Sequence, residues 1–464
     1  MDLFQQFLES NGTLEWGKYI QNQFYIKIYT HRDRSEIPSY DYQNYSFSVE
    51  DQLALQRENL VALYHEHLHY AHEISTIAGI NDFFSQINLA TIFCDSVAVP
   101  RTSYFQDIKP QDKALFFSML NTRKAIYGSD SSHLANRIVL EIRQIDWIDF
   151  QALEPESGTY TPLSIPMLTY HYFDQQTKCY ETDSLTLGKY LIYEGLAHEL
   201  DHILDEQLHP GRSSKGHIGS EYHILKLLGK LLAPHIEHRQ LLELASLALS
   251  CRNPGACLVH FLYSIHQAPE PKLFLEEKKQ QTQNMLREQL PKIKESIEQI
   301  REQYRPKDAL YQAITHLSSH MIAGLEQRIE DPTFEIEVTF DPKKNLAKYI
   351  PLCDMMYVLD EPDKYMTEFL GTYLSPNLSY DLKIYLCYID YFQSMTTLAR
   401  SKDKTENHTC PLYSCCNCQM RKTDPQICQT QPRESFEWSI RNSVQCPYYY
   451  GVAYTNGTDQ SPRY

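Results

Sequence analysis

Glycine is scarce in this chain, at 16 of 464 residues, whereas proteins average roughly 7%. Tight turns that need glycine must therefore be few, and a turn-rich β-sandwich is disfavoured. Basic residues are also in deficit, because 43 Lys and Arg face 59 Asp and Glu and leave a net charge of −16. A protein that binds nucleic acid or anionic membranes needs a positive surface, so we expect neither partner.

Long apolar runs are missing as well. No stretch approaches the roughly 20 apolar residues that span a bilayer, and the first residues, MDLFQQFLES, lack the basic-then-apolar pattern of a secretory signal. We therefore expect a soluble cytoplasmic protein, and its twelve cysteines must be explained without assuming disulfides. Six of them are scattered, and the other six lie between Cys410 and Cys446.

The remaining pattern predicts a mainly α protein of the α+β class. Residues 24–30, FYIKIYT, are aromatic and β-branched and predict a strand in a small N-terminal sheet. Helices are expected where apolar residues recur every three to four positions. The expected helices span 48–79 with a stop at Gly79, 112–121, 132–145, 184–209 and 221–232, and a Pro-bearing connection joins 145 to about 182.

The second half of the chain is expected to be largely helical. Residues 276–306 are polar at most positions and predict a solvated helix, or a helical pair broken at Pro291. We expect three domains: a catalytic domain over 1–268, a helical domain over 269–400 and a Cys-rich tail over 401–464.

Two copies of the motif H-E-x-x-H carry the chemistry of this sequence. The first is His65-Glu66-His67-Leu68-His69, and the second is His198-Glu199-Leu200-Asp201-His202. On a helix, positions i and i+4 share one face, so two imidazoles converge on one metal ion. The intervening glutamate can then take a proton from the attacking water, which is the chemistry of amide hydrolysis.

The residues Glu194-Gly195-Leu196-Ala197 precede the second motif. Together with the first motif they resemble the gluzincin metallopeptidases, in which a later helix with an E-G-x-A signature supplies a third ligand. The resemblance implies a zinc peptidase acting on a peptide or protein, with a helical zincin-like core. It implies His65, His69 and Glu194 as zinc ligands and Glu66 as general base. It covers about 40 residues, and 124 residues separate His69 from Glu194.

Helical spacing also predicts how the two motifs meet. Glu194, His198 and His202 form one stripe of their helix, and His65, His69 and His72 form a stripe of the other. Two such polar stripes are best satisfied when they face each other. His198 would then lie beside the metal as an oxyanion stabiliser or a hydrogen-bond donor, while His72 and Glu73 would orient the liganding imidazoles.

Three other interpretations fit the same residues. The second motif alone could bind zinc through His198 and His202, with Glu199 as base and Glu221 as third ligand. The two E-x-x-H pairs, Glu66 with His69 and Glu199 with His202, could instead belong to a di-iron oxidase or oxygenase, completed by Glu58 and Glu141. The third interpretation is a metal-stabilised interaction protein without catalysis.

The tail has the spacing C-x4-C-C-x-C-x9-C-x17-C. Four thiolates from short loops bind a structural zinc ion or an iron-sulfur cluster. Cys410, Cys415, Cys418 and Cys428 are the predicted ligands, with Cys416 or Cys446 as substitutes. The alternative is a set of free or disulfide-linked cysteines.

Overall fold

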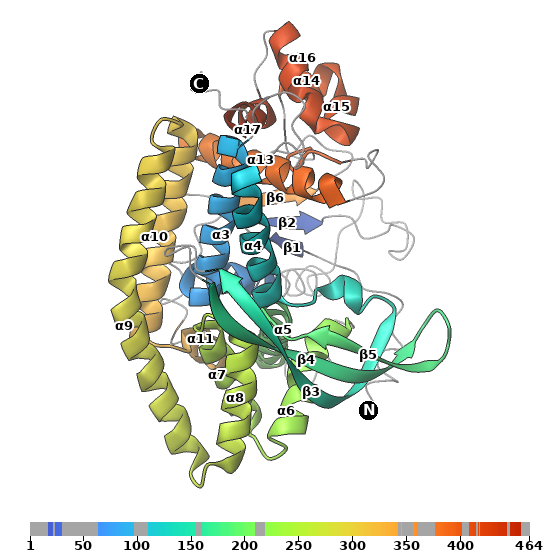
Figure 1. Ribbon diagram of the computed structural model, residues 1–464, viewed down its shortest axis with the longest axis vertical. Helices are drawn as coiled ribbons and strands as arrows, with labels where there is room; N and C mark the ends of the chain where they lie inside the picture. The colour runs from blue at the N-terminus through green and yellow to red at the C-terminus, as the bar shows by residue number, and fades with distance from the viewer. Residues whose placement is uncertain are drawn as a thin grey trace, which may run out of the picture.

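The computed structural model confirms a mainly α protein with small β elements. The structure describes residues 17–21, 24–29, 64–96, 110–153, 160–208, 219–341, 345, 356–360, 376–400, 408–413, 416, 418–442 and 446–455. Helices fill most of the molecule, and a twisted sheet and a group of short C-terminal helices lie at opposite ends of it (Figure 1). None of the described helices is long and apolar enough to cross a membrane.

One small sheet joins the N-terminal part of the chain to a distant segment. Its strands are β1 (Gly17–Ile20), β2 (Tyr25–Tyr29) and β6 (Met356–Asp360), in the order β1-β2-β6. The strand predicted over 24–30 is thereby confirmed as β2. It pairs antiparallel with β1 and parallel with β6, where Tyr25 lies opposite Met356.

A second sheet replaces a predicted helix. Its antiparallel strands are β3 (Arg137–Leu153), β4 (Tyr160–Asp174) and β5 (Tyr180–Thr186), so the helix expected over 132–145 and the irregular connection after it are both wrong. The register of β3 shifts between Val139 and Glu141 and again between Ile142 and Gln144. Each bulge adds a residue to one face of the strand, and apolar residues spaced by three then resemble a helix.

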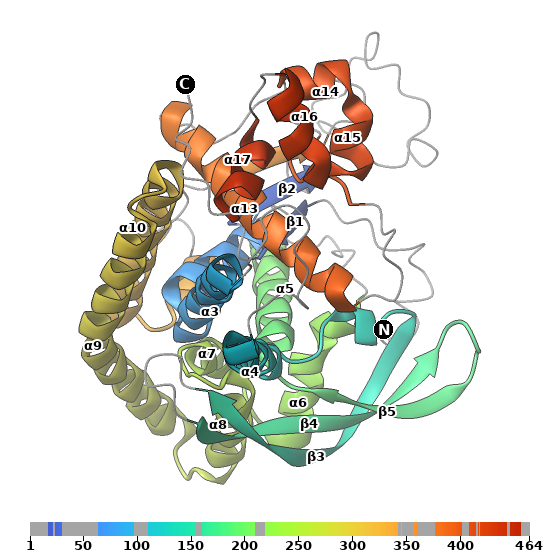
Figure 2. The ribbon, with the colours of Figure 1, turned by 45° about the horizontal axis from the view of Figure 1, so that its top comes forward.

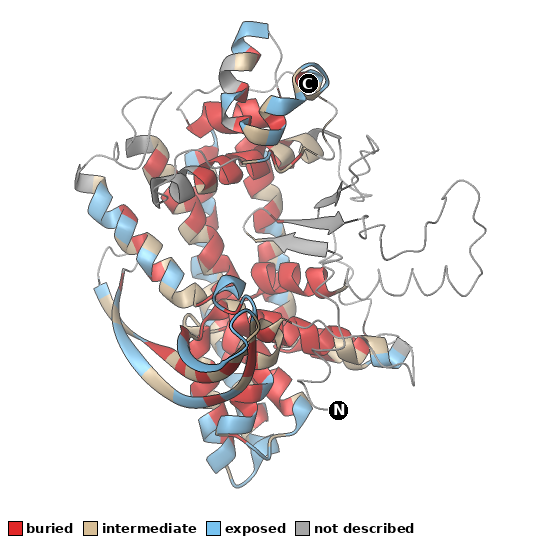
Figure 3. Cartoon of the chain, turned by 90° about the vertical axis from the view of Figure 1, so that its right-hand side faces the viewer, coloured by how far each residue is buried: buried red, intermediate tan, exposed pale blue. Residues whose placement is uncertain are grey.

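This sheet has one face toward the helices and one toward solvent. Leu168, Tyr170 and Tyr172 of β4 are buried in the same core as α6 (Ile224–Leu232) and α8 (Pro254–Gln267). The first five residues of β5 are exposed, whereas the buried residues gather in the helical interior (Figure 3). The sheet therefore covers the helical layer from outside.

The helix with the first motif covers residues 64–75, bends at Thr76 and continues as α3 (Ile77–Ser96). The predicted stop at Gly79 is wrong, because Gly79 lies inside α3. A Cβ atom at this position would clash with the backbone oxygen of Glu73. The glycine therefore allows the chain to pass close to itself at the bend rather than ending the helix.

The helix expected over 112–121 is confirmed within α4 (Pro110–Tyr127), and the helix of the second motif is α5 (Lys189–Leu208). Residues 276–306 form part of a single helix, α9 (Pro271–Tyr304), rather than a broken pair. Pro291 lies on its exposed side, where water can replace the backbone hydrogen bond that a proline removes. The opposite side of α9 packs along α10 (Asp308–Glu330) (Figure 1).

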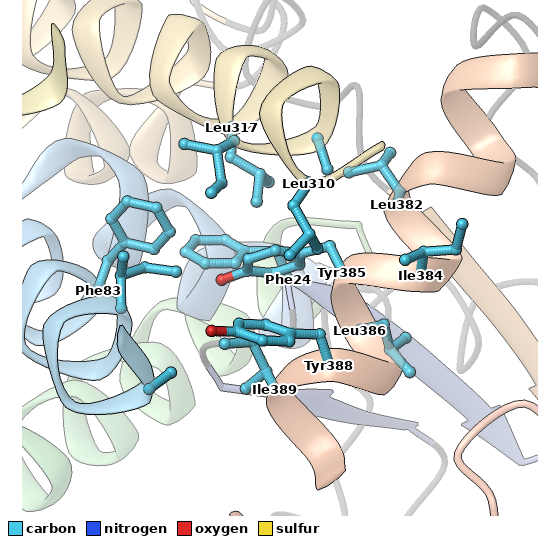
Figure 4. Packing of buried hydrophobic residues seen from close by; sticks show 14 of the residues in the cluster. Phe24, Phe83, Leu310, Leu317, Leu382, Ile384, Tyr385, Leu386, Tyr388 and Ile389 are labelled. Atoms are coloured by element: carbon cyan, nitrogen blue, oxygen red, sulfur yellow. The ribbon is translucent and has the colours of Figure 1, made fainter. Parts of the chain in front are cut away.

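The buried residues form two clusters. One gathers α3, α10 and α13 (Pro376–Arg400) around Phe24, and Figure 4 shows Phe83, Leu310, Tyr385 and Tyr388 in it. The other joins α5, α6, α8 and α7 (His238–Leu249) to the sheet β3-β4-β5. Tail residues, among them Cys446, belong to the first cluster, so side chains from all three predicted domains share one core.

Candidate metal centre

Three ligand atoms from two helices meet in the interior of the protein. Nε2 of His65 lies 3.0 Å from Nε2 of His69. The carboxylate Oε2 of Glu194 lies 3.3 Å from Nε2 of His69 and 3.7 Å from Nε2 of His65. All three residues are buried. In the part of the chain that the structure describes, they are the one group of three or more His, Cys, Asp or Glu side chains whose ligand atoms lie within 4.8 Å of one another.

The donor set and its spacing fit a divalent metal ion, of which zinc is one example. Two imidazole nitrogens and one carboxylate oxygen are the ligands of His₂Glu zinc enzymes, with metal–ligand distances of about 2.0–2.2 Å. Ligands at that distance in a tetrahedron are separated by roughly 3.4 Å, close to the three separations found here. His65, His69 and Glu194 could therefore hold zinc with little rearrangement, and three protein ligands leave one position open.

Local sequence explains the positions of the ligands. His65 and His69 are separated by four residues on the helix over 64–75, so their rings project from the same side. Glu194 belongs to the first turns of α5. The next residue is Gly195, where a Cβ atom would stand 2.8 Å from Cβ of Leu225 in α6. The absence of a side chain at Gly195 thus lets α6 approach α5 directly beside Glu194.

The two kinds of ligand differ in charge. Burial would raise the pKa of Glu194, but the adjacent imidazoles of His69 and His65 outweigh it and hold that pKa far below its ordinary value. Burial lowers the pKa of His69 to about 4. Burial would also lower the pKa of His65, but the hydrogen-bonded carboxylates of Asp201 and Glu194 outweigh it and raise that pKa well above its ordinary value. Glu194 is therefore ionised and His69 neutral, and a bound metal ion would displace the proton of His65.

A carboxylate of the second motif, that of Asp201, contacts a histidine of the first motif, His65. Oδ2 of Asp201 lies 2.7 Å from Nδ1 of His65, and both side chains are buried. This contact directs Nε2 of His65 toward Glu194 and His69. Carboxylate–histidine pairs of this kind raise the basicity of a metal ligand and fix its orientation. Asp201 occupies a variable position of its motif, and the spacing of the sequence gives no indication of its role.

Aromatic rings surround the three ligands. The ring of Tyr193 lies 4.1 Å from that of His69, and the ring of Tyr222 lies 5.8 Å from that of His65. His198 is buried, and its ring centroid lies 5.1 Å from that of Tyr222. Its Nδ1 is 4.0 Å from Asp201. His198 thus lies beside Tyr222 and Asp201, which both contact His65, and outside the group of three candidate ligands.

Glu66 lies next to these groups. It is 8% exposed, and its charge acts on His65 and on Tyr222. His72 has a different neighbour from the one expected. Its Nε2 lies 3.4 Å from the buried Glu335, and the orienting role predicted for His72 is taken by Asp201.

The second H-E-x-x-H motif does not form a metal site of its own among the described residues. Oε2 of Glu199 lies 2.8 Å from both His238 and Lys226. His202 lies near the surface, 3.6 Å from Glu206. Glu199 is therefore engaged in ion pairs, and it is not grouped with His198, His202 and Glu221 around a common point.

One carboxylate that the di-iron interpretation expects on a helix does not lie on one. Glu141 was expected on a helix, but it lies exposed on strand β3, paired with Arg143 at 2.7 Å. Glu58 lies outside the described residues. The engagement of Glu199 with Lys226 and His238 also removes it from Glu66 and His69 as a shared ligand.

The predicted tail ligands are partly brought together. Cys410, Cys418 and Cys428 line one cavity together with Cys416 and Cys446. Cys415 lies outside the described residues.

Comparison with known proteins adds no further assignment, because no protein family, no curated protein and no solved structure gives a significant match to this chain.

Proposed function

We propose that this protein is a zinc-dependent metallopeptidase that hydrolyses a peptide or related amide bond. The observation that carries the proposal is the convergence of His65, His69 and Glu194 within 4.8 Å, with Glu66 in the H-E-x-x-H sequence between the two histidines. Paired carboxylates on further helices, which a di-iron oxidase needs, do not accompany this group among the described residues.

Each residue has a defined part in this proposal. His65, His69 and Glu194 would hold the zinc ion, which would supply an acidified water and a Lewis acid for the substrate carbonyl. The Glu66 carboxylate accepts the proton of the attacking water and returns it to the leaving amine. Asp201 keeps His65 in the tautomer with a free Nε2. Tyr222 and His198 supply hydrogen-bond donors beside His65, where an oxyanion would develop.

The test separates metal binding from catalysis. Purified full-length protein and its variants would be assayed for bound zinc and for cleavage of a quenched fluorescent peptide library. Glu66→Gln should keep its zinc and lose about 10²–10⁴-fold in rate. His65→Ala and Glu194→Gln should lose zinc and activity together.

Glu206→Gln, an exposed change on the same helix as Glu194, is the matched control and should alter neither quantity. Equal zinc content in His65→Ala and unmodified protein would eliminate this metal site. Zinc bound at the site without turnover of any peptide would exclude the peptidase and favour a metal-stabilised interaction protein.

A further inference from the structure

Five cysteines of the tail converge on one small cavity. Cys410, Cys416, Cys418, Cys428 and Cys446 line it, together with Leu412, Met420 and Tyr448. It lies among α14 (Gln419–Thr423), α15 (Pro425–Thr430), α16 (Ser435–Asn442) and α17 (Pro447–Thr455), which gather against α13 in both ribbon views (Figure 2). The cavity of about 10 Å³ has room for one water-sized sphere.

The thiols in this cavity are arranged around one of them. The neighbouring thiols of Cys416, Cys428 and Cys446 lower the pKa of Cys418. The pKa of Cys410 is raised by a different neighbour, Cys387 of α13. The group of four therefore keeps Cys418 and Cys428 of the predicted ligands and takes both substitutes, Cys416 and Cys446, in place of Cys410 and of Cys415, which lies outside the described residues.

The backbone holds this group from separate parts of the tail. Cys410 and Cys428 are joined by a backbone hydrogen bond of 2.8 Å, and the amide of Tyr449 donates to Sγ of Cys446 at 3.3 Å. Cys428 and Cys446 are buried, and all four cysteines are free thiols rather than halves of a disulfide. Four thiols gathered from neighbouring short segments of the chain are a common arrangement of structural zinc sites.

The size of the cavity favours one ion over a cluster. Room for a single water-sized sphere accommodates one cation, whereas an iron-sulfur cluster adds several iron and sulfide atoms. Among single ions, zinc is the usual divalent metal of structural sites in which four thiolates form a tetrahedron. Each thiol would lose its proton to solvent on binding.

We propose that Cys416, Cys418, Cys428 and Cys446 bind one structural zinc ion, at a site independent of the proposed catalytic centre. The ion would tie α14, α15 and α17 together next to α13. No three of the described cysteines have sulfur atoms within 4.8 Å of one another, whereas thiolates about 2.3 Å from one zinc ion are closer than that. Binding would therefore draw the other three sulfurs toward Cys418.

The docking of α17 on α13 indicates what the zinc site stabilises. A Cβ atom at Gly451 of α17 would stand 2.7 Å from the backbone nitrogen of Tyr388 in α13. Backbones this close leave no room for α17 to shift. A metal that fixes Cys446, immediately before α17, would hold the helix in this position.

The experiment measures zinc in the full chain, purified under reducing conditions. We expect two zinc ions per chain. Cys418→Ser and Cys446→Ser should each lose the zinc ion of the tail and keep the zinc ion of the proposed catalytic centre. His65→Ala should lose only the ion of the catalytic centre. Cys257→Ser, a partly buried cysteine of α8 outside the tail, is the matched control and should keep both.

A second measurement does not depend on the folding of variants. Cobalt-substituted protein should show the intense sulfur-to-cobalt charge-transfer bands of a thiolate site, and X-ray absorption of the zinc protein should show sulfur ligands near about 2.3 Å. Both zinc ions retained in Cys418→Ser, a disulfide among these cysteines in the reduced preparation, or iron with a broad visible absorption would each overturn the proposal. Failure of the catalytic centre would remove only the His65-dependent ion.

Discussion

The carboxylate of Asp201 lies 2.7 Å from Nδ1 of His65 and joins the two H-E-x-x-H motifs of this protein. In the proposed metal centre one motif would supply two nitrogen ligands, and the other would supply the group that orients one of them. The repetition of the motif therefore does not indicate two metal sites. It places a helix with the ligand Glu194 and the orienting Asp201 opposite the helix with His65 and His69.

Replacing Asp201 should weaken zinc binding without removing a ligand. In Asp201→Asn the buried charge next to His65 disappears, so we expect the zinc affinity to fall by about 10–100-fold. Competition with a chromophoric chelator would measure it. Glu206→Gln on the same helix should bind as tightly as the unmodified protein, and an equal affinity in Asp201→Asn would contradict the orienting role.

Replacing Glu199 should lower the free energy of unfolding and leave zinc binding unchanged. In Glu199→Gln the ion pairs with His238 and Lys226 are lost. Both partners are almost half exposed, so we expect the free energy of unfolding to fall by only about 1–2 kcal/mol. Urea denaturation and zinc analysis of the same samples would measure the two quantities. Loss of zinc from Glu199→Gln would show that the second motif binds metal after all.

Arg328 is the largest buried cation of the described core. Replacing it while Glu335 is kept should strongly lower the free energy of unfolding. Arg328 is fully buried, and it lies 3.3 Å from the equally buried Glu335 and hydrogen-bonds Ser75 and Ser246. Arg328→Met should lower the free energy of unfolding by about 3–5 kcal/mol, because the charge of Glu335 stays buried without it.

Neutralising the partner is the control for this prediction. The double variant Arg328→Met with Glu335→Gln should recover part of the loss. An unchanged deficit in the double variant would mean that packing, and not the uncompensated charge, sets the cost. Chemical denaturation of both variants would decide between these causes.

The contribution of Asp82 to the free energy of unfolding should depend on pH. Burial would raise the pKa of Asp82, but Arg123 and Lys189, at 2.6 and 3.0 Å, lower it from 3.8 to about 2. A depressed pKa gives stability that is present above about pH 3.8 and is lost as the pH falls toward 2. Asp82→Asn should therefore be less stable than the unmodified protein by about 3 kcal/mol at about pH 7.

Denaturation curves at several pH values test the direction of this effect. The difference between Asp82→Asn and the unmodified protein should shrink when the pH is lowered below 3.8. A difference that stays constant over that range would exclude the ionised carboxylate as its source.

Gly195 tests the contact between α5 and α6. In an ordinary exposed helix, Gly→Ala stabilises by about 1 kcal/mol. Here a Cβ atom would stand 2.8 Å from Leu225, so Gly195→Ala should instead destabilise by about 1–3 kcal/mol. It should also weaken zinc binding through the adjacent Glu194. Thermal melting gives the sign, and a stabilised Gly195→Ala would show that α6 accommodates the methyl group.

Local patterns in the sequence were sufficient to predict two helices, one strand and the helix face that two histidines share. The i, i+4 spacing places His65 and His69 on one side of a helix whatever surrounds it, because the helical repeat is a property of the backbone. The same periodicity predicted α4 and α5, and the β-branched run predicted β2. It failed for β3, where two bulges change the spacing of the apolar residues.

Long-range packing decided the rest. Glu194 and Asp201 are far in sequence from the histidines that they contact, 125 residues from His69 to Glu194 and 136 from His65 to Asp201, and no local rule specifies which carboxylate of α5 faces inward. That choice depends on how α5 packs against α6 at Gly195 and on the partners that engage Glu199. The sequence by itself determined which residue types were present and their helical spacing. The tertiary structure determined their roles, since a side chain's role depends on its neighbours in space.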